Sequence, residues 1–101
     1  MAKAHDAARL RRVLNLFALL GHSLRVVILQ RLAREPSTAG ELAQRLPVSR
    51  TAIVQHLKLL EAAGLVWAGY EGKRRVYRVS PSGLEPIQEW IARIGGSQSL
   101  R

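Results

Sequence analysis

The sequence contains no cysteine and only one aspartate among its 101 residues, and these shortages exclude several kinds of chemistry. Without thiols the chain forms neither disulfides nor a thiolate metal site or sensor. The single Asp6 lies near the start of the chain, no serine and histidine are paired with a third orienting group, and no glycine-rich phosphate loop is present. This inventory argues against an enzyme.

Long hydrophobic runs are also missing. The longest uninterrupted apolar run, residues 16–20, is far shorter than the roughly 20 residues of a membrane-spanning helix. No secretory signal pattern opens the chain. We therefore expect a soluble cytoplasmic protein without membrane contacts, folded as a single domain over residues 1–101, with mobile ends at 1–5 and 97–101.

Positive charge is what the chain has in excess. Sixteen lysines and arginines against seven acidic residues give a formal net charge of +9. Thirteen of the sixteen are arginine, whose guanidinium suits bidentate contacts with phosphate or guanine. This balance predicts a polyanionic partner, and nucleic acid is the first candidate.

The segment 38–65 is the most informative part of the chain and reads TAGELAQRLPVSRTAIVQHLKLLEAAGL. Thr38 and Glu41 have the spacing of a capping box for a short helix at 39–46. After a break at residues 47–48, Ser49 is expected to cap a longer helix, which Gly64 ends. The segment therefore predicts a helix-turn-helix, whose second helix reads DNA in proteins of this kind.

Periodicity predicts the elements on either side of this motif. Helices are expected at 6–20 and at 24–34, the second capped by Ser23. After Gly64 the apolar period changes to two, which predicts strands at 65–70 and 75–79 around a loop at 71–74. A last helix begins after Pro81, with Pro86 in its first turn. The fold class is mainly α with a β-hairpin wing, a winged helix-turn-helix.

Polar and basic side chains in the helix-turn-helix and at the hairpin tip form the predicted DNA-binding set. Its members in the helix-turn-helix are Thr38, Ser49, Arg50, Thr51, Val54, Gln55, His56 and Lys58, and at the hairpin tip they are Lys73, Arg74 and Arg75. Arginine reads guanine and glutamine reads adenine in the major groove, so Arg50 and Gln55 are the expected base readers. Strand alternation places Arg74 and Arg75 on opposite sides, so we expect only one of them to reach DNA.

Two further features suggest metal or carboxylate sites but have simpler interpretations. His56 has no Asp, Cys or second His near it in the sequence, so packing or phosphate contact is the expected role. Glu85 and Glu89 share one face of the last helix and are interpreted as its solvated edge. No cofactor and no metal ion are expected.

The first and last helices carry more apolar surface than one small domain needs. The first helix is apolar on more than one side, with Leu10, Val13, Leu14, Phe17 and Leu20 as its expected core face. A homodimer would bury the excess. The predicted interface comprises Val13, Leu16, Phe17, Leu19, Leu84, Ile87, Trp90, Ile91 and Ile94.

Three segments, 19–29, 49–65 and 72–77, together make the chain resemble the ArsR/SmtB family of bacterial and archaeal repressors. The resemblance covers most of the chain, from Leu14 to Ile94. It implies a homodimeric repressor that binds a pseudo-palindromic double-stranded operator, with its terminal helices in the dimer interface. The family's metal-sensing motifs are absent, because the third helix has no cysteine and residues 82–94 offer only glutamates.

Two other functions are compatible with the same elements. A winged helix can serve as a protein-interaction module, and a basic one can bind nucleic acid without sequence preference. The combination of Arg50 and Gln55 on a polar-capped helix favours specific DNA. Whether a small-molecule effector relieves repression is left open.

Overall fold

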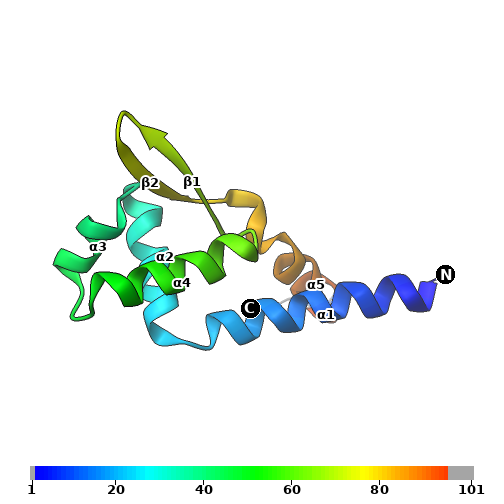
Figure 1. Ribbon diagram of the computed structural model, residues 1–101. Helices are drawn as coiled ribbons and strands as arrows, with labels where there is room; N and C mark the ends of the chain where they lie inside the picture. The colour runs from blue at the N-terminus through cyan, green and yellow to red at the C-terminus, as the bar shows by residue number, and fades with distance from the viewer. Residues whose placement is uncertain (1, 96–101) are drawn as a thin grey trace.

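The computed structural model describes residues 2–95 and has the predicted order of elements (Figure 1). Residue 1 and the expected mobile end at 97–101 lie outside the described residues. The elements are α1 (Ala2–Leu20), α2 (Ser23–Arg34), α3 (Ala39–Arg45), α4 (Arg50–Ala62), β1 (Val66–Glu71), β2 (Arg74–Val79), the short 3-10 helix η1 (Pro81–Leu84) and α5 (Glu85–Gly95). The winged helix-turn-helix is confirmed.

Capping residues fix the helix-turn-helix as the sequence predicts. The Thr38 hydroxyl accepts the Glu41 N–H at 3.1 Å while a Glu41 carboxylate oxygen accepts the Thr38 N–H at 2.8 Å, so the capping box is complete. Ser49 accepts the Ala52 N–H at 3.1 Å at the start of α4. Gly64 has a φ of 79° just beyond the end of α4, a conformation that glycine adopts without steric cost.

The boundaries of the first two helices differ from the prediction. Helix α1 begins at Ala2 instead of residue 6, which is consistent with the high helix propensity of its alanine-rich start. Helix α2 is capped by His22 and not by Ser23, which is its first helical residue. The Nδ1 atom of His22 accepts the Leu24 N–H at 3.2 Å, so the imidazole performs the role assigned to a hydroxyl.

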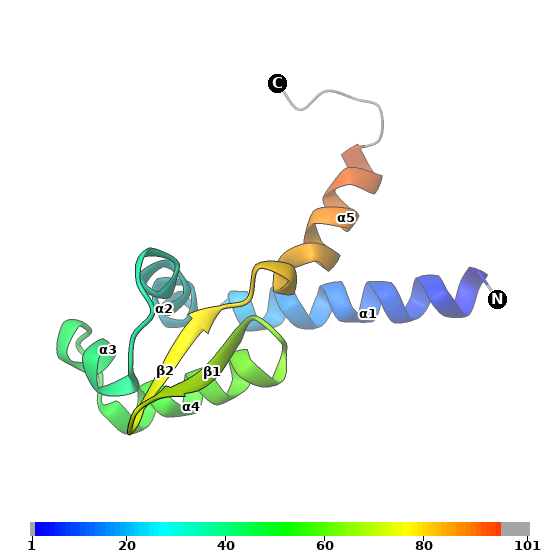
Figure 2. The same ribbon diagram turned by 90° about the horizontal axis from the view of Figure 1, so that it is seen from above.

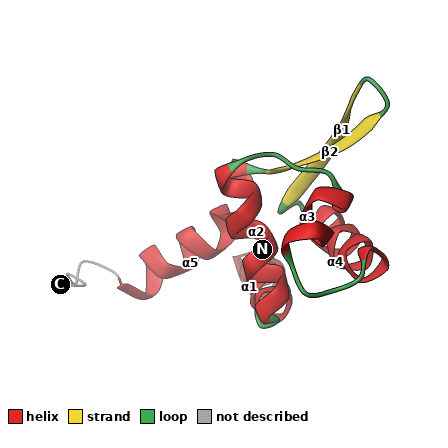
Figure 3. Cartoon of the chain, turned by 90° about the vertical axis from the view of Figure 1, so that its left-hand side faces the viewer, coloured by secondary structure: helices red, strands yellow, loops and turns green. Residues whose placement is uncertain are grey.

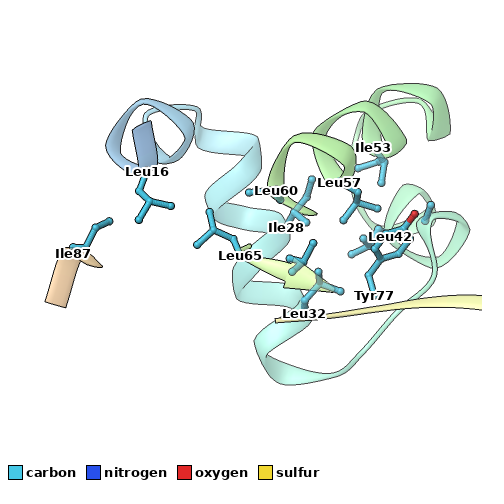
Figure 4. Close-up of a cluster of buried hydrophobic side chains, with 12 residues drawn as sticks. Leu16, Ile28, Leu32, Leu42, Ile53, Leu57, Leu60, Leu65, Tyr77 and Ile87 are labelled. Atoms are coloured by element: carbon cyan, nitrogen blue, oxygen red, sulfur yellow. The ribbon is translucent and has the colours of Figure 1, made fainter. Parts of the chain in front are cut away.

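The hydrophobic core lies between α2, α3, α4 and the hairpin (Figure 4). Ile53, Leu57 and Leu60 on one face of α4 are completely buried, as their spacing predicts. They pack with Ile28 of α2 and Leu42 of α3, which are also fully buried. This packing fixes the opposite face of α4 toward solvent.

The hairpin is longer and tighter than predicted. Its register runs from Val66 opposite Val79 to Glu71 opposite Arg74, so the loop contains only Gly72 and Lys73 instead of four residues. Gly72 has a φ of 64°, and a positive φ at the first loop position alone is the pattern of a type II′ turn. The two-residue loop places Arg74 inside a strand.

A bridge that no local sequence pattern predicts ties the hairpin to the helix-turn-helix. Ser37 and Tyr77 exchange backbone hydrogen bonds of 3.2 and 2.8 Å. Because Ser37 directly precedes the cap of α3, the hairpin is anchored at the start of the helix-turn-helix.

The buried side of α1 differs from the predicted one. Val13 and Leu16 are buried within the subunit, whereas Leu10, Leu14 and Phe17, which were expected in its core, are exposed. Helix α1 packs against α2 and α5, and its Leu16 joins the main core. Figure 2 shows α5 leaving α1 at an angle, so that its C-terminal turns stand clear of the other elements.

No single helix among the described residues is long and apolar enough to cross a membrane. Helices α1 and α2 reach that length and composition only as a pair, and the pair bends by 93° where α1 meets α2.

Candidate nucleic-acid interface

The solvent-facing side of α4 carries the predicted base-reading residues. Arg50, Thr51, Gln55 and Lys58 are exposed, and Val54 is half-buried between them and the core. They lie opposite the face whose isoleucine and leucines are buried, as the helical period requires. An α-helix presented in this way has the dimensions to enter a major groove.

A hollow of about 830 Å³ lies between the start of α3, the exposed side of α4 and the hairpin. Figure 3 shows the hairpin projecting beside α3 and α4. Seven of the eleven predicted DNA-binding residues line this hollow: Thr38, Arg50, Val54, Lys58, Lys73, Arg74 and Arg75. Ser49, Thr51, Gln55 and His56 lie on α4 or at its cap but outside the hollow.

The five cations of this hollow fall into two groups. Within the part of the chain that the structure describes, Arg50, Lys58 and Lys73 have no carboxylate within 4.0 Å. The two wing arginines do: Arg74 Nη2 lies 3.0 Å from a Glu41 oxygen, and Arg75 Nη2 lies 3.6 Å from a Glu61 oxygen. Arg74 and Arg75 therefore turn to different helices, α3 and α4.

Arg75 is held by more than its ion pair. Its Nε donates to the Tyr77 hydroxyl at 3.2 Å, and its guanidinium lies 5.6 Å from the centroids of the Tyr70 and Tyr77 rings. The hydrogen bond with Tyr77 is the main reason that the pKa of Arg75 is raised above its usual value. Both tyrosines are missing from the predicted site, although strand alternation places Tyr70 and Tyr77 on the same side as Arg75.

Glu41 combines two roles at the start of α3. One carboxylate oxygen completes the capping box and the other pairs with Arg74. The hydrogen bond from the Thr38 N–H, followed by the charge of Arg74, lowers the pKa of this exposed carboxyl. Glu41 is therefore ionised at neutral pH, beside the positions expected to meet phosphates.

His56 has no second histidine near it in the sequence, but the fold brings His22 beside it. The turn before α2 places the His22 ring 4.7 Å from the His56 ring, measured between centroids. Arg25 Nε donates to His56 Nδ1 at 3.1 Å, and Arg25 Nη1 donates to the Leu19 carbonyl at 3.3 Å. Burial, His22 and Arg25 lower the pKa of His56. These contacts link His56 of α4 to α2 and to the turn before it.

Both histidines of this pair are engaged in hydrogen bonds. The Nδ1 atom of His22 accepts the Leu24 N–H, and the Nδ1 atom of His56 accepts from Arg25 Nε. Over residues 2–95, no three His, Cys, Asp or Glu side chains gather in a way that could hold a metal ion.

A helix-turn-helix with an exposed polar second helix and an adjoining basic hairpin defines the class of winged helix-turn-helix domains. A family model described as a helix-turn-helix domain matches residues 20–66. The HTH-type transcriptional regulator Rv2034 of Mycobacterium tuberculosis is 48% identical over 69 residues, which cover 68% of this chain. The match spans 64% of that relative's length.

Solved structures identify the family within this class. An ArsR-like transcriptional regulator from Rhodococcus sp. RHA1 superimposes with a TM-score of 0.77 at 39% identity, over 84% of this chain and 80% of that one. A possible transcriptional regulator for arsenical resistance gives 0.68 at 33% identity, over 77% and 81%. The homodimeric winged helix-turn-helix domain of Mb0332 from Mycobacterium bovis gives 0.72 at 25% identity, over 95% and 88%. The chain belongs to the ArsR family.

Proposed function

We propose that this protein is a homodimeric transcriptional repressor, not an enzyme, that binds a pseudo-palindromic operator through α4 and the hairpin. Residues 1–101 act as a single DNA-binding domain, and binding blocks access of the polymerase to the promoter. The names of its relatives, which are transcriptional regulators and a homodimeric DNA-binding domain, support this proposal.

The observation that carries the proposal is the unpaired positive charge around the exposed side of α4. Arg50 and Lys58 on the helix and Lys73 on the hairpin line one hollow, and none of them meets a carboxylate within the described residues. Such cations supply the electrostatic part of DNA binding. Gln55, exposed on the same helix, adds the paired donor and acceptor that read adenine.

The caps of the helix-turn-helix add phosphate contacts of a different kind. The hydroxyl oxygens of Thr38 and Ser49 accept backbone N–H groups, which leaves each O–H free to donate. Neutral donors of this sort fix the register of a protein on the duplex without reading its sequence.

The apolar surface of α1 and α5 supports a homodimer, with a revised set of residues. Val13, Leu16 and Ile87 are already buried inside the subunit, so they support the interface from beneath and do not form its surface. The exposed apolar residues of the two helices and of η1 before α5 are Leu10, Leu14, Phe17, Leu84, Ile91 and Ile94. Trp90 packs edge-on against Phe17 with 5.5 Å between ring centroids and joins the two helices.

A two-fold axis through this surface would bury the same patch on both subunits. It would also place the two α4 helices about one DNA turn apart, roughly 34 Å, as a pseudo-palindromic operator requires. The absence of cysteine, and the use of the Nδ1 atoms of His22 and His56 as hydrogen-bond acceptors, support a repressor without a metal-sensing site.

The proposal is tested by fluorescence anisotropy with the DNA upstream of the protein's own gene and a random duplex of equal length. A repressor of this kind prefers the upstream DNA by about a thousandfold or more at physiological salt. Equal, salt-sensitive binding to both duplexes would identify a general nucleic-acid binder. No binding to either would favour a protein-interaction module.

A further inference from the structure

The two wing arginines already have partners in the free protein, and both partners belong to the helix-turn-helix. Glu41 at the start of α3 pairs with Arg74, and Glu61 in the last turn of α4 pairs with Arg75. Glu61, Arg74 and Arg75 line the same hollow, and Glu41 is joined to it through its ion pair with Arg74. Two of the three cations at the hairpin tip are thus neutralised before any DNA arrives.

We infer that Glu41 and Glu61 occupy the place of DNA phosphates in the free protein, so that the duplex must displace them to engage the wing. A carboxylate and a phosphate offer arginine the same bidentate pair of acceptor oxygens. All four side chains are roughly 40 to 55% exposed, so the pairs are accessible to exchange. This inference rests on the proposed function. It adds that the protein's own carboxylates compete with DNA phosphates for the wing arginines and so weaken DNA binding.

The geometry around Arg75 shows how such an exchange can proceed. The Tyr70 and Tyr77 rings and the Tyr77 hydroxyl hold the guanidinium independently of Glu61. The contact with Glu61 is the longest of its polar contacts, at 3.6 Å. Arg75 can therefore change its anionic partner while the tyrosines keep it in place, which makes Glu61 the exchangeable part of the site.

Glu61→Gln tests the inference, because it removes the competing charge and keeps the size of the side chain. An exposed ion pair is a weak interaction, so the gain in DNA affinity should be about two- to fivefold per subunit. A dimer has two wings, and its gain should be about 4- to 25-fold. Glu71→Gln is the matched control: it removes the same charge from the hairpin, but Glu71 pairs with Arg78 and does not line the hollow. We expect it to change affinity less than twofold per subunit.

A double-mutant cycle with Arg75→Gln separates exchange from simple repulsion. If DNA displaces Glu61 from Arg75, the gain from Glu61→Gln is larger in the wild-type background than in the Arg75→Gln background. Equal gains in both backgrounds would mean that Glu61 merely repels DNA. A larger gain in the Arg75→Gln background would mean that the pair stays closed in the complex. Either of these two results would overturn the inference.

The same cycle applies to Glu41 and Arg74. The amide introduced by Glu41→Gln has an oxygen that can accept the Thr38 N–H, so the capping box survives the substitution. Each variant is compared with the wild type by circular dichroism before binding is measured.

Both cycles are measured on the upstream DNA and on a random duplex, because phosphates are common to both. If the protein binds both duplexes equally, the proposed repressor is contradicted, but the double-mutant cycles at Arg74 and Arg75 still test the inference. A protein that binds no DNA at all would overturn both proposals.

Discussion

Ile91→Asp is the most direct test of the proposed dimer, because Ile91 lies on the exposed apolar side of α5. Its side chain is 42% exposed in the subunit, so a partner would cover the remaining surface. Full burial of an isoleucine contributes about 1.5–3 kcal/mol, and the exposed fraction corresponds to about 1 kcal/mol per copy. Burying an aspartate that has no hydrogen-bonding partner costs about a further 1–3 kcal/mol.

A two-fold axis places Ile91 of both subunits in the interface, so both energy costs count twice. A loss of about 2–4 kcal/mol per copy becomes about 4–8 kcal/mol for the dimer, which raises its dissociation constant by about a thousandfold or more. Sedimentation equilibrium should therefore detect monomer at concentrations where the wild type is dimeric. Operator binding should disappear with the dimer, since each half-site alone supplies too few contacts.

The control for this experiment is Ala92→Asp, which adds the same charge to an exposed position off the apolar stripe of α5. It should remain dimeric. Circular dichroism of Ile91→Asp should show a folded chain, because the side chain is only partly covered by its own subunit. A dimeric Ile91→Asp protein would place the interface elsewhere, and an unfolded one would assign Ile91 to the subunit core.

The remaining predictions concern DNA reading, metals and pH. Arg50→Ala or Gln55→Ala should cost about 1–3 kcal/mol and relax base preference at one position per half-site, measured with a library of operator variants. Lys73→Ala should weaken all sequences alike and make the slope of log affinity against log salt shallower by about 0.9 for each phosphate that it no longer neutralises. Zinc, nickel, cadmium or arsenite at micromolar levels should leave operator affinity unchanged, and a stoichiometric zinc titration in a calorimeter would contradict this. Because burial lowers the pKa of His56, the folded chain keeps this ring neutral. The contribution of His56 to the free energy of unfolding should therefore be fully present above the ordinary histidine pKa of about 6.5, and it should decrease as the pH falls below that value. Urea titrations should show a smaller decrease for His56→Gln, whose amide oxygen can still accept from Arg25.

Features set by neighbouring residues were predictable from the sequence. The capping box of Thr38 and Glu41, the cap at Ser49 and the turn at Gly64 depend on residues a few positions apart, and the structure has all three. The buried stripe of α4 follows from helical spacing alone. These local rules were enough to identify the helix-turn-helix and to place its exposed side.

Contacts between distant segments were not predictable in this way. Arg25 and His56 are 31 positions apart, and Glu41 and Arg74 are 33 apart. No period or motif specifies which of several arginines will meet a given glutamate. The candidate site could therefore be predicted as a set of residue types on two elements, whereas the pairing of the wing arginines required the packed hairpin.

The apolar residues of α1 show a limit of a different kind. Leu14 and Leu16 are chemically identical and two positions apart, yet Leu14 is 58% exposed and Leu16 is buried. Composition and periodicity mark both as residues that must leave water, because burial within the subunit and burial against a second copy have the same driving force. Only the positions of α2 and α5 decide which side of α1 the subunit covers itself. The side left uncovered, with Leu10, Leu14 and Phe17, then becomes the strongest structural argument for a second copy.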